Sequence, residues 1–131
     1  MDAASMTTAS TITPAEMAAY RATARRRRER EQQELVQRQE RAWEVARCAA
    51  THLRAQFGVD RVMVFGSLVR AGCFTLWSDV DLAAWGLSPQ DTFRAIGAAM
   101  DLDPTLAINL VDVRTCRPEL LAAIEQEGIA L

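Results

Sequence analysis

The sequence predicts an α/β domain, and three observations lead to this prediction. The chain has 131 residues, which is the length of a single domain. Segments with helical and strand-like periodicity alternate in the order α-β-(α)-β-α-β-α, without internal repeats. The composition is ordinary for a globular protein, with 50% apolar and 24% charged residues.

A long helix is predicted over residues 14–57. Thr13 is the expected N-cap, Pro14 takes the first helical position, and Glu16 completes a capping box. No further proline and no glycine interrupts the chain before Gly58, which is the expected C-cap residue. The second half of this helix carries an apolar stripe that should face a core, formed by Leu35, Ala42, Trp43, Ala46, Ala49, Ala50, Leu53 and Phe57.

The charge of the chain is distributed unevenly. Residues 1–13 are small and polar and are predicted to be disordered. Residues 25–34 (RRRREREQQE) include no apolar residue, so a helix there must stand in solvent or lie on a partner. Residues 21–47 hold nine arginines against five glutamates, and residues 48–131 hold six arginines against ten acids. The overall charge of −2 argues against direct nucleic-acid binding, but one basic helical face could meet an acidic partner or a phosphate.

Three strands are predicted after the long helix, near residues 61–65, 79–84 and 106–113. The first contains a short, fully apolar run, which is typical of a buried strand. The second alternates acidic and apolar residues, as a strand with one polar face does. A short helical turn is expected near residues 68–70, between these two strands.

Two shorter helices complete the predicted domain. One begins at Ser88-Pro89 and ends near Met100, and the other begins at Arg117-Pro118 and ends at Gly128. The first of them is expected to place a single face toward the core, formed by Phe93, Ile96, Gly97 and Met100.

The segment 62–86 (VMVFGSLVRAGCFTLWSDVDLAAWG) brings together residues suited to phosphate chemistry. Gly66 and Ser67 follow an apolar strand; glycine allows a phosphate to approach the backbone, and the serine hydroxyl and the helix N-terminal amides can donate to it. Asp79 and Asp81 are two residues apart, so both carboxylates lie on one face of a strand. Oxygen ligands of this kind select Mg²⁺ or Mn²⁺. An Asp-x-Asp pair alone is common on solvated strand faces, but the combination indicates phosphoryl or nucleotidyl transfer.

This segment resembles the signature of the DNA polymerase β-like nucleotidyltransferase superfamily. That signature is an apolar strand, a Gly-Ser pair, about nine to thirteen residues, and then Asp-h-Asp-h, where h is apolar. Here it stands as Phe65-Gly66-Ser67, eleven residues, and Asp79-Val80-Asp81-Leu82. The closest resemblance is to minimal nucleotidyltransferases that are paired with HEPN-domain proteins. It covers residues 35–131 and extends to 14–34 in character only. Four further positions resemble one subgroup of this family: Arg70, Phe74, Trp77 and Ser78.

The resemblance implies a fold, a reaction and a partner. The fold would be a small mixed sheet flanked by helices, with a disordered segment 1–13, a long helix 14–57 and a nucleotidyltransferase domain 58–131. The reaction would be Mg²⁺-dependent transfer of AMP from ATP to a hydroxyl of a partner protein. The partner would be a HEPN ribonuclease toxin, which would make this chain its antitoxin.

The resemblance also implies a role for individual residues. Asp79 and Asp81 would ligate the metal ion, and Gly66, Ser67 and Arg70 would bind the triphosphate. The family's third carboxylate should stand at position 109, where this chain has Asn109. An asparagine can ligate a metal through its carbonyl oxygen, but it cannot accept a proton as a base.

Two further residues depart from the pattern or compete with it. Ala71 replaces the glycine that usually follows the arginine, which is a mild change. Asp112 lies three residues after Asn109 and should face the opposite side of a regular strand. Nucleotide binding is therefore compatible with weak or lost catalysis. The alternative hypothesis is an inactive module that neutralises its partner by binding alone. Nucleotidylation of a small molecule is a third hypothesis, which the lack of an added acceptor domain disfavours.

The other chemically active side chains favour simpler interpretations. His52 is expected to be solvated or packed, Cys73 to fill a small space, and Trp43, Trp77 and Trp85 to anchor core or loops. The chain has no lysine and therefore no Walker A motif. No apolar run reaches the length of a membrane span, no secretory signal is present, and three cysteines match no metal template, so a soluble cytoplasmic protein is expected.

Overall fold

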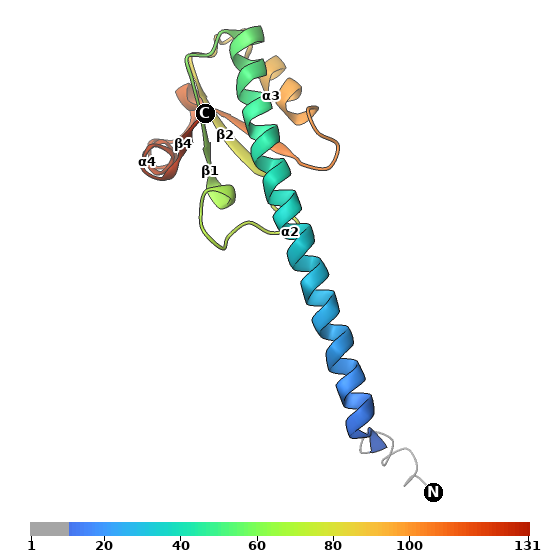
Figure 1. The fold of residues 1–131 in the computed structure, drawn as a ribbon. Coiled ribbons are helices and arrows are strands. Elements are labelled where there is room, and N and C mark those ends of the chain that lie inside the picture. The colour runs from blue at the N-terminus through green and yellow to red at the C-terminus, as the bar shows by residue number, and fades with distance from the viewer. Residues whose placement is uncertain (1–10) are drawn as a thin grey trace, which may run out of the picture. The chain divides into compact units, whose positions relative to one another are not determined.

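The computed structural model describes residues 11–131, which form an α/β fold (Figure 1). The chain divides into two compact units, residues 1–34 and residues 35–131. The predicted disorder of residues 1–13 falls mostly outside the described residues. The elements, in chain order, are α2 (Pro14–Phe57), β1 (Arg61–Phe65), the 3-10 helix η2 (Gly66–Leu68), β2 (Val80–Trp85), α3 (Thr92–Met100), β3 (Ile108–Asp112), the 3-10 helix η3 (Val113–Thr115), α4 (Pro118–Glu127) and β4 (Ile129–Ala130).

The long N-terminal helix is confirmed with its expected signals at both ends. At its start, the Thr13 amide donates to Glu16 Oε2 at 3.2 Å and the Glu16 amide donates to Thr13 Oγ1 at 3.1 Å, which is the reciprocal capping box. At its end, Gly58 adopts a φ of 62° and its amide donates to the Arg54 carbonyl at 3.1 Å. A left-handed residue directly after the last turn is favourable for glycine, and it stops the helix there.

The sheet is mixed and has four strands in the order β3-β2-β1-β4. Strand β2 pairs with β3 in parallel, whereas β1 pairs with β2 and with β4 in antiparallel fashion. The α/β class and the three predicted strands are confirmed. Strand β4 was not predicted: it consists of two residues after Gly128 and extends the sheet beside β1.

Helices cover both faces of the sheet, which lies between α3 and α4 in Figure 1. Side chains alternate across a strand, so Val62 and Val64 of β1 point to one face and Met63 points to the other. The first face packs against α2 and α3, and the second packs against Ile124 of α4. The buried residues of α2 all belong to its second half: Ala42, Val45, Ala46, Ala49, Ala50 and Leu53.

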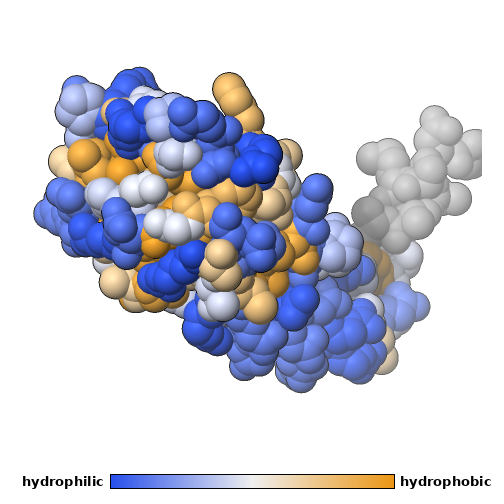
Figure 2. Space-filling model, turned by 90° about the horizontal axis from the view of Figure 1, so that it is seen from above, coloured by the Kyte–Doolittle hydropathy of each residue, from blue (hydrophilic) through white to orange (hydrophobic). Residues whose placement is uncertain are grey.

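The face predicted to be buried on the first short helix is confirmed for Ile96, which packs against the core, and is wrong for Phe93 and Met100, which are 87% and 58% exposed. The fully buried residues of α3 are Ala95 and Ala99. Small residues at this interface let α3 approach the sheet closely. The space-filling view shows apolar residues reaching the surface between polar ones on the face that it presents (Figure 2).

Helix α3 also begins later than expected, at Thr92. The Ser88 carbonyl accepts a hydrogen bond from the Asp91 amide at 3.0 Å, so residues 88–91 form a turn before the helix. Among residues 11–131, no helix has the length and apolarity needed to cross a bilayer.

Candidate functional site

Two neighbouring parallel strands bring the acidic pair and Asn109 together. Asp81 of β2 stands opposite Asn109 of β3 in the strand register, and Asp79 directly precedes β2. The Asn109 amide Nδ2 donates to Asp79 Oδ2 at 3.3 Å and to Asp81 Oδ1 at 3.2 Å. Val80, between the two acids, is fully buried and anchors the strand in the core. The three polar side chains therefore converge on one side of the sheet.

Asn109 occupies the position where the resemblance requires a third acid. Within the described part of the chain, no group of three histidine, cysteine, aspartate or glutamate residues gathers that could hold a metal ion. The site consists instead of two carboxylates and one amide. An amide has a donor end and an acceptor end, so rotation of the Asn109 side chain would present Oδ1 to a cation in place of Nδ2.

The electrostatics of Asp81 reflect this arrangement. Burial raises the pKa of the Asp81 carboxyl above its usual value, the hydrogen bond from Asn109 lowers it, the nearby Asp79 raises it and Arg70 lowers it, with a raised pKa as the net result. Asp81 is partly desolvated and lies beside a second carboxylate. A positive ion between the two would stabilise their ionised forms.

The Gly66-Ser67 turn packs directly against this pair. Gly66 has a φ of 77°, a conformation that side chains rarely adopt, and it begins η2 immediately after β1. A Cβ atom at Gly66 would overlap the Asp81 carboxylate. Glycine is thus required here both by the backbone and by the close approach of Asp81. The Ser67 hydroxyl lies on the same turn and is half-buried.

Arg70 follows this turn and pairs with a residue that the sequence did not single out. Its Nε lies 3.1 Å from Glu127 Oε2 at the end of α4, and both side chains are about half exposed, at 55% and 45%. The guanidinium also lowers the pKa of Asp81, which places its charge within electrostatic reach of the acid pair. A half-exposed ion pair of this kind is weak.

Asp112 belongs to a separate arrangement. It pairs with Ala84 in the register, is buried, and accepts hydrogen bonds from Thr92 Oγ1 at 3.0 Å and from the Arg114 amide at 3.1 Å. These contacts cap η3 and join β3 to α3. Asp112 therefore has a structural role, and Asn109 is the β3 side chain that reaches the acid pair.

Two arginines of α2 hold the loops that lead into the site, and sequence reasoning missed both. Arg38 donates from Nη2 to the Ser78 carbonyl at 3.1 Å and from Nη1 to the Thr105 carbonyl at 3.0 Å. The first carbonyl directly precedes Asp79, and the second precedes β3. Arg38 thus links the starting points of both site strands to one helix.

Arg41 holds the second of these loops one turn further along α2. Its guanidinium lies 2.8 Å from Asp103 Oδ2. The other carboxylate oxygen accepts from the Thr105 amide and hydroxyl and from the Leu106 amide, at 2.7 to 3.0 Å. The Thr105 hydroxyl is the main cause that lowers the pKa of Asp103 to about 2, against the effect of burial, with further lowering from the Thr105 amide and Arg41.

Trp77 was expected to anchor the core or a loop, and this prediction is wrong. Its side chain is 84% exposed on the loop between η2 and β2. Trp43 is half-buried against the core, and Trp85 lies under the Arg61 guanidinium, 4.4 Å from the ring centroid.

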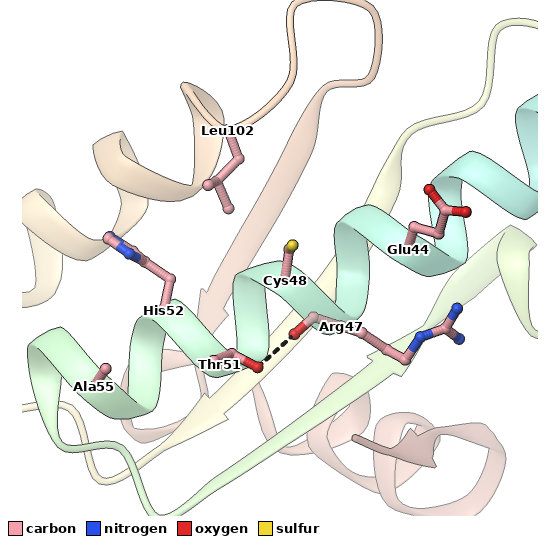
Figure 3. Close-up of a pocket in the computed structure, with 7 residues that line it drawn as sticks. All are labelled: Glu44, Arg47, Cys48, Thr51, His52, Ala55 and Leu102. Atoms are coloured by element: carbon pink, nitrogen blue, oxygen red, sulfur yellow. Dashed lines mark hydrogen bonds between the residues drawn. The ribbon is translucent and has the colours of Figure 1, made fainter.

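A separate shallow pocket of about 620 Å³ lies along α2, and its residues are drawn in Figure 3. Cys48 and His52, one helical turn apart, point from α2 toward the side on which Leu102 lies (Figure 3). The His52 ring packs edge-on against Phe57, with 6.3 Å between the centroids. His52 is thus a packed, half-buried histidine, as expected. Among the described residues, the three cysteines are free.

No protein-family model matches this chain, and no curated protein matches it either.

Proposed function

We propose that the chain is an Mg²⁺-dependent nucleotidyltransferase that transfers AMP from ATP to a hydroxyl of a partner protein. The new phosphodiester replaces the α–β phosphoanhydride bond, and pyrophosphate and the hydroxyl proton are released. One observation carries this proposal: Asp79, Asp81 and Asn109 converge beside the Gly66-Ser67 turn. The Gly-Ser pair and the two aspartates, in this order, are the residues on which the resemblance to polymerase β-like nucleotidyltransferases rests, whereas Asn109 stands where that family has a third acid. The close packing of Gly66 against Asp81 supports the view that the turn and the acids act as one site.

The side chains of the site suit a hard divalent cation. Asp79 and Asp81 would hold Mg²⁺ or Mn²⁺, because carboxylate oxygens are the ligands that these ions prefer. Asp79 is exposed to solvent, whereas Asp81 is half-buried and belongs to strand β2. When bound, the ion would offset the negative charge of the triphosphate and polarise its phosphorus–oxygen bonds.

The residues around the acids have distinct tasks in this proposal. Gly66 leaves the backbone of the turn open to a phosphate, and the Ser67 hydroxyl donates to it. Arg70 adds positive charge at the phosphate after leaving Glu127. Asn109 holds both carboxylates in place, but it provides no base for the proton of the attacking hydroxyl. Transfer should therefore be slow.

A second candidate function follows from the same asparagine. Because the Asn109 amide donates to both carboxylates, the acid pair is tied together by the protein itself. These hydrogen bonds hold the acids in place even if the protein has no catalytic activity. The chain would then be a module that neutralises its partner by binding alone. For either function the resemblance points to a HEPN ribonuclease toxin as the partner, in the cytoplasm.

Nucleotide titration tests the site. In the wild-type chain ATP should bind in the presence of Mg²⁺ and much more weakly in its absence. The double variant Asp79→Asn/Asp81→Asn should lose this metal dependence, because neutral amides replace the two charged ligands. Asp101→Asn, the same change at an exposed position after α3, is the matched control and should bind like the wild type. Equal ATP affinity in the wild type and the double variant would exclude the metal site.

A further inference from the structure

The loop between η2 and β2 ends in an ordered turn that exposes a large aromatic side chain. The Ser78 amide donates to the Thr75 carbonyl at 3.2 Å, and the Thr75 amide donates to Ser78 Oγ at 2.9 Å. The Trp77 amide donates to Thr75 Oγ1 at 3.2 Å. Just before the turn, Phe74 is buried in the core. The turn is thus fixed at its base by Phe74 and internally by these hydrogen bonds, yet Trp77 remains 84% exposed.

An indole held in solvent by a well-bonded turn contributes little to the stability of the fold. Burying apolar area is the main favourable contribution to folding, and this side chain contributes almost nothing to it. The stability of the fold therefore gives no reason for a tryptophan at this position, and what distinguishes Trp77 from the exposed Phe93 is its place two residues before Asp79. The hydroxyl groups of the turn are already engaged with each other, with 3.0 Å between Thr75 Oγ1 and Ser78 Oγ, so the indole face is the main surface that the turn offers.

The turn stands at the edge of the acid site. The loop leaves the site at Gly66, which packs on Asp81, and returns to it at Asp79. Only Ser78 separates Trp77 from Asp79 and the peptide bonds are trans, so their Cα atoms are at most about 7.6 Å apart. A triphosphate bound by Ser67 and the two acids would thus extend its nucleoside within reach of the indole.

We propose that Trp77 is the surface on which the base of the bound nucleotide stacks. This inference rests on the proposed function and assigns the nucleoside end of the same site. An indole offers a flat, polarisable face, and every nucleobase has a π face that can stack on it. Trp77 therefore contributes affinity for the base, while Gly66, Ser67 and the acids contribute affinity for the phosphates.

The test compares ATP with inorganic tripolyphosphate, which carries the phosphates without a base. Both are titrated in Mg²⁺ against the full chain with Trp77→Ala and Trp77→Phe. Trp77→Ala should weaken ATP binding about ten-fold or more, the scale of one base–aromatic stack. It should leave tripolyphosphate affinity unchanged, and Trp77→Phe should retain most of the ATP affinity. Phe93→Ala removes an equally exposed aromatic from α3 and should change neither titration.

The other outcomes each overturn the assignment in a distinguishable way. Unchanged ATP affinity in Trp77→Ala, with or without loss of partner binding, would show that the indole does not carry the base. An equal loss of ATP and tripolyphosphate would show that Trp77 acts through Asp79. If neither ligand binds the wild-type chain in Mg²⁺, the proposed function fails and this inference fails with it.

Discussion

Asn109 is the residue that decides between the two proposed functions. Its amide nitrogen reaches both acids, at 3.3 and 3.2 Å, at a position where a third carboxylate would add negative charge and a proton acceptor. Asparagine supplies one neutral oxygen at most, so the site has fewer charges to balance a second metal ion. The two carboxylates and Asn109 are arranged as one cluster, but position 109 provides no carboxylate that could accept a proton.

Replacing this amide by an acid should restore catalysis. A positioned base increases the rate of a reaction by about a hundred- to ten-thousand-fold, so Asn109→Asp should raise the rate of AMP transfer by about a hundred-fold or more. The measurement is the transfer of label from α-labelled ATP to the co-purified partner. Asp112→Asn is the matched control, because Asp112 contacts Thr92 and Arg114 instead of the acid pair. Rapid transfer by the wild type that Asp112→Asn abolishes would contradict this assignment.

At the scale of elements, helix α2 holds the strands of the site through two arginines. Arg38 bonds the carbonyls that precede Asp79 and β3, and Arg41 pairs with the buried Asp103. The two arginines join a helix to two loops that lie far away in sequence. The positions of Asp79 and Asn109 therefore depend on α2 as well as on strand pairing.

The Asp103 contact predicts a defined pH dependence of stability. The pKa of Asp103 is lowered to about 2 in the folded chain, and an unfolded aspartate has a pKa of about 3.9. Its contribution is therefore fully present above pH ~4 and is lost as the pH falls toward 2, by on the order of 2 kcal/mol. Urea unfolding at pH 5 and pH 3 measures about half of this loss, because pH 3 lies midway between the two pKa values.

The control for this pH dependence is Asp103→Asn, which cannot ionise. The variant should be less stable than the wild type at pH 5, and the difference between the two should shrink at pH 3. A difference that stays constant between these pH values would contradict the assigned pKa.

At the scale of the whole molecule, the two compact units differ in what they bury. All the buried residues of α2 lie between Ala42 and Leu53, within the unit 35–131. The arginine-rich segment 25–34 is exposed throughout. The unit 35–131 thus holds a packed core, whereas residues 25–34 of the other unit form a helical segment with an exposed surface.

Removing residues 1–33 should leave the packed domain folded. Core burial supplies most of the stability, and none of residues 11–33 is buried, so the free energy of unfolding should change by less than about 1 kcal/mol. Urea unfolding of the truncated and full chains tests this expectation, and co-purification measures partner binding. A truncated chain that does not fold would contradict the unit boundary. A folded chain that no longer holds its partner would identify the segment as an interaction arm.

Local signals in the sequence determined the ends of the long helix and the placement of the two acids. The capping box at Thr13 and Glu16 and the glycine at position 58 set the ends of α2. The spacing of Asp79 and Asp81 predicted that both carboxylates lie on the same side of the chain, and Asn109 contacts both. Each of these signals acts between residues a few positions apart, through backbone hydrogen bonds and side-chain periodicity, so the sequence alone was enough to find them.

Only the tertiary structure decided the rest. The bond of Asn109 to Asp81 joins residues 28 positions apart, that of Arg70 to Glu127 joins residues 57 apart, and that of Arg38 to Thr105 joins residues 67 apart. No local pattern specifies such pairs, because they depend on strand register and on how closely helices approach the sheet. The same packing decided that α3 buries Ala95 and Ala99 and leaves Phe93 in solvent, since the space available at an interface is a property of all the elements that form it.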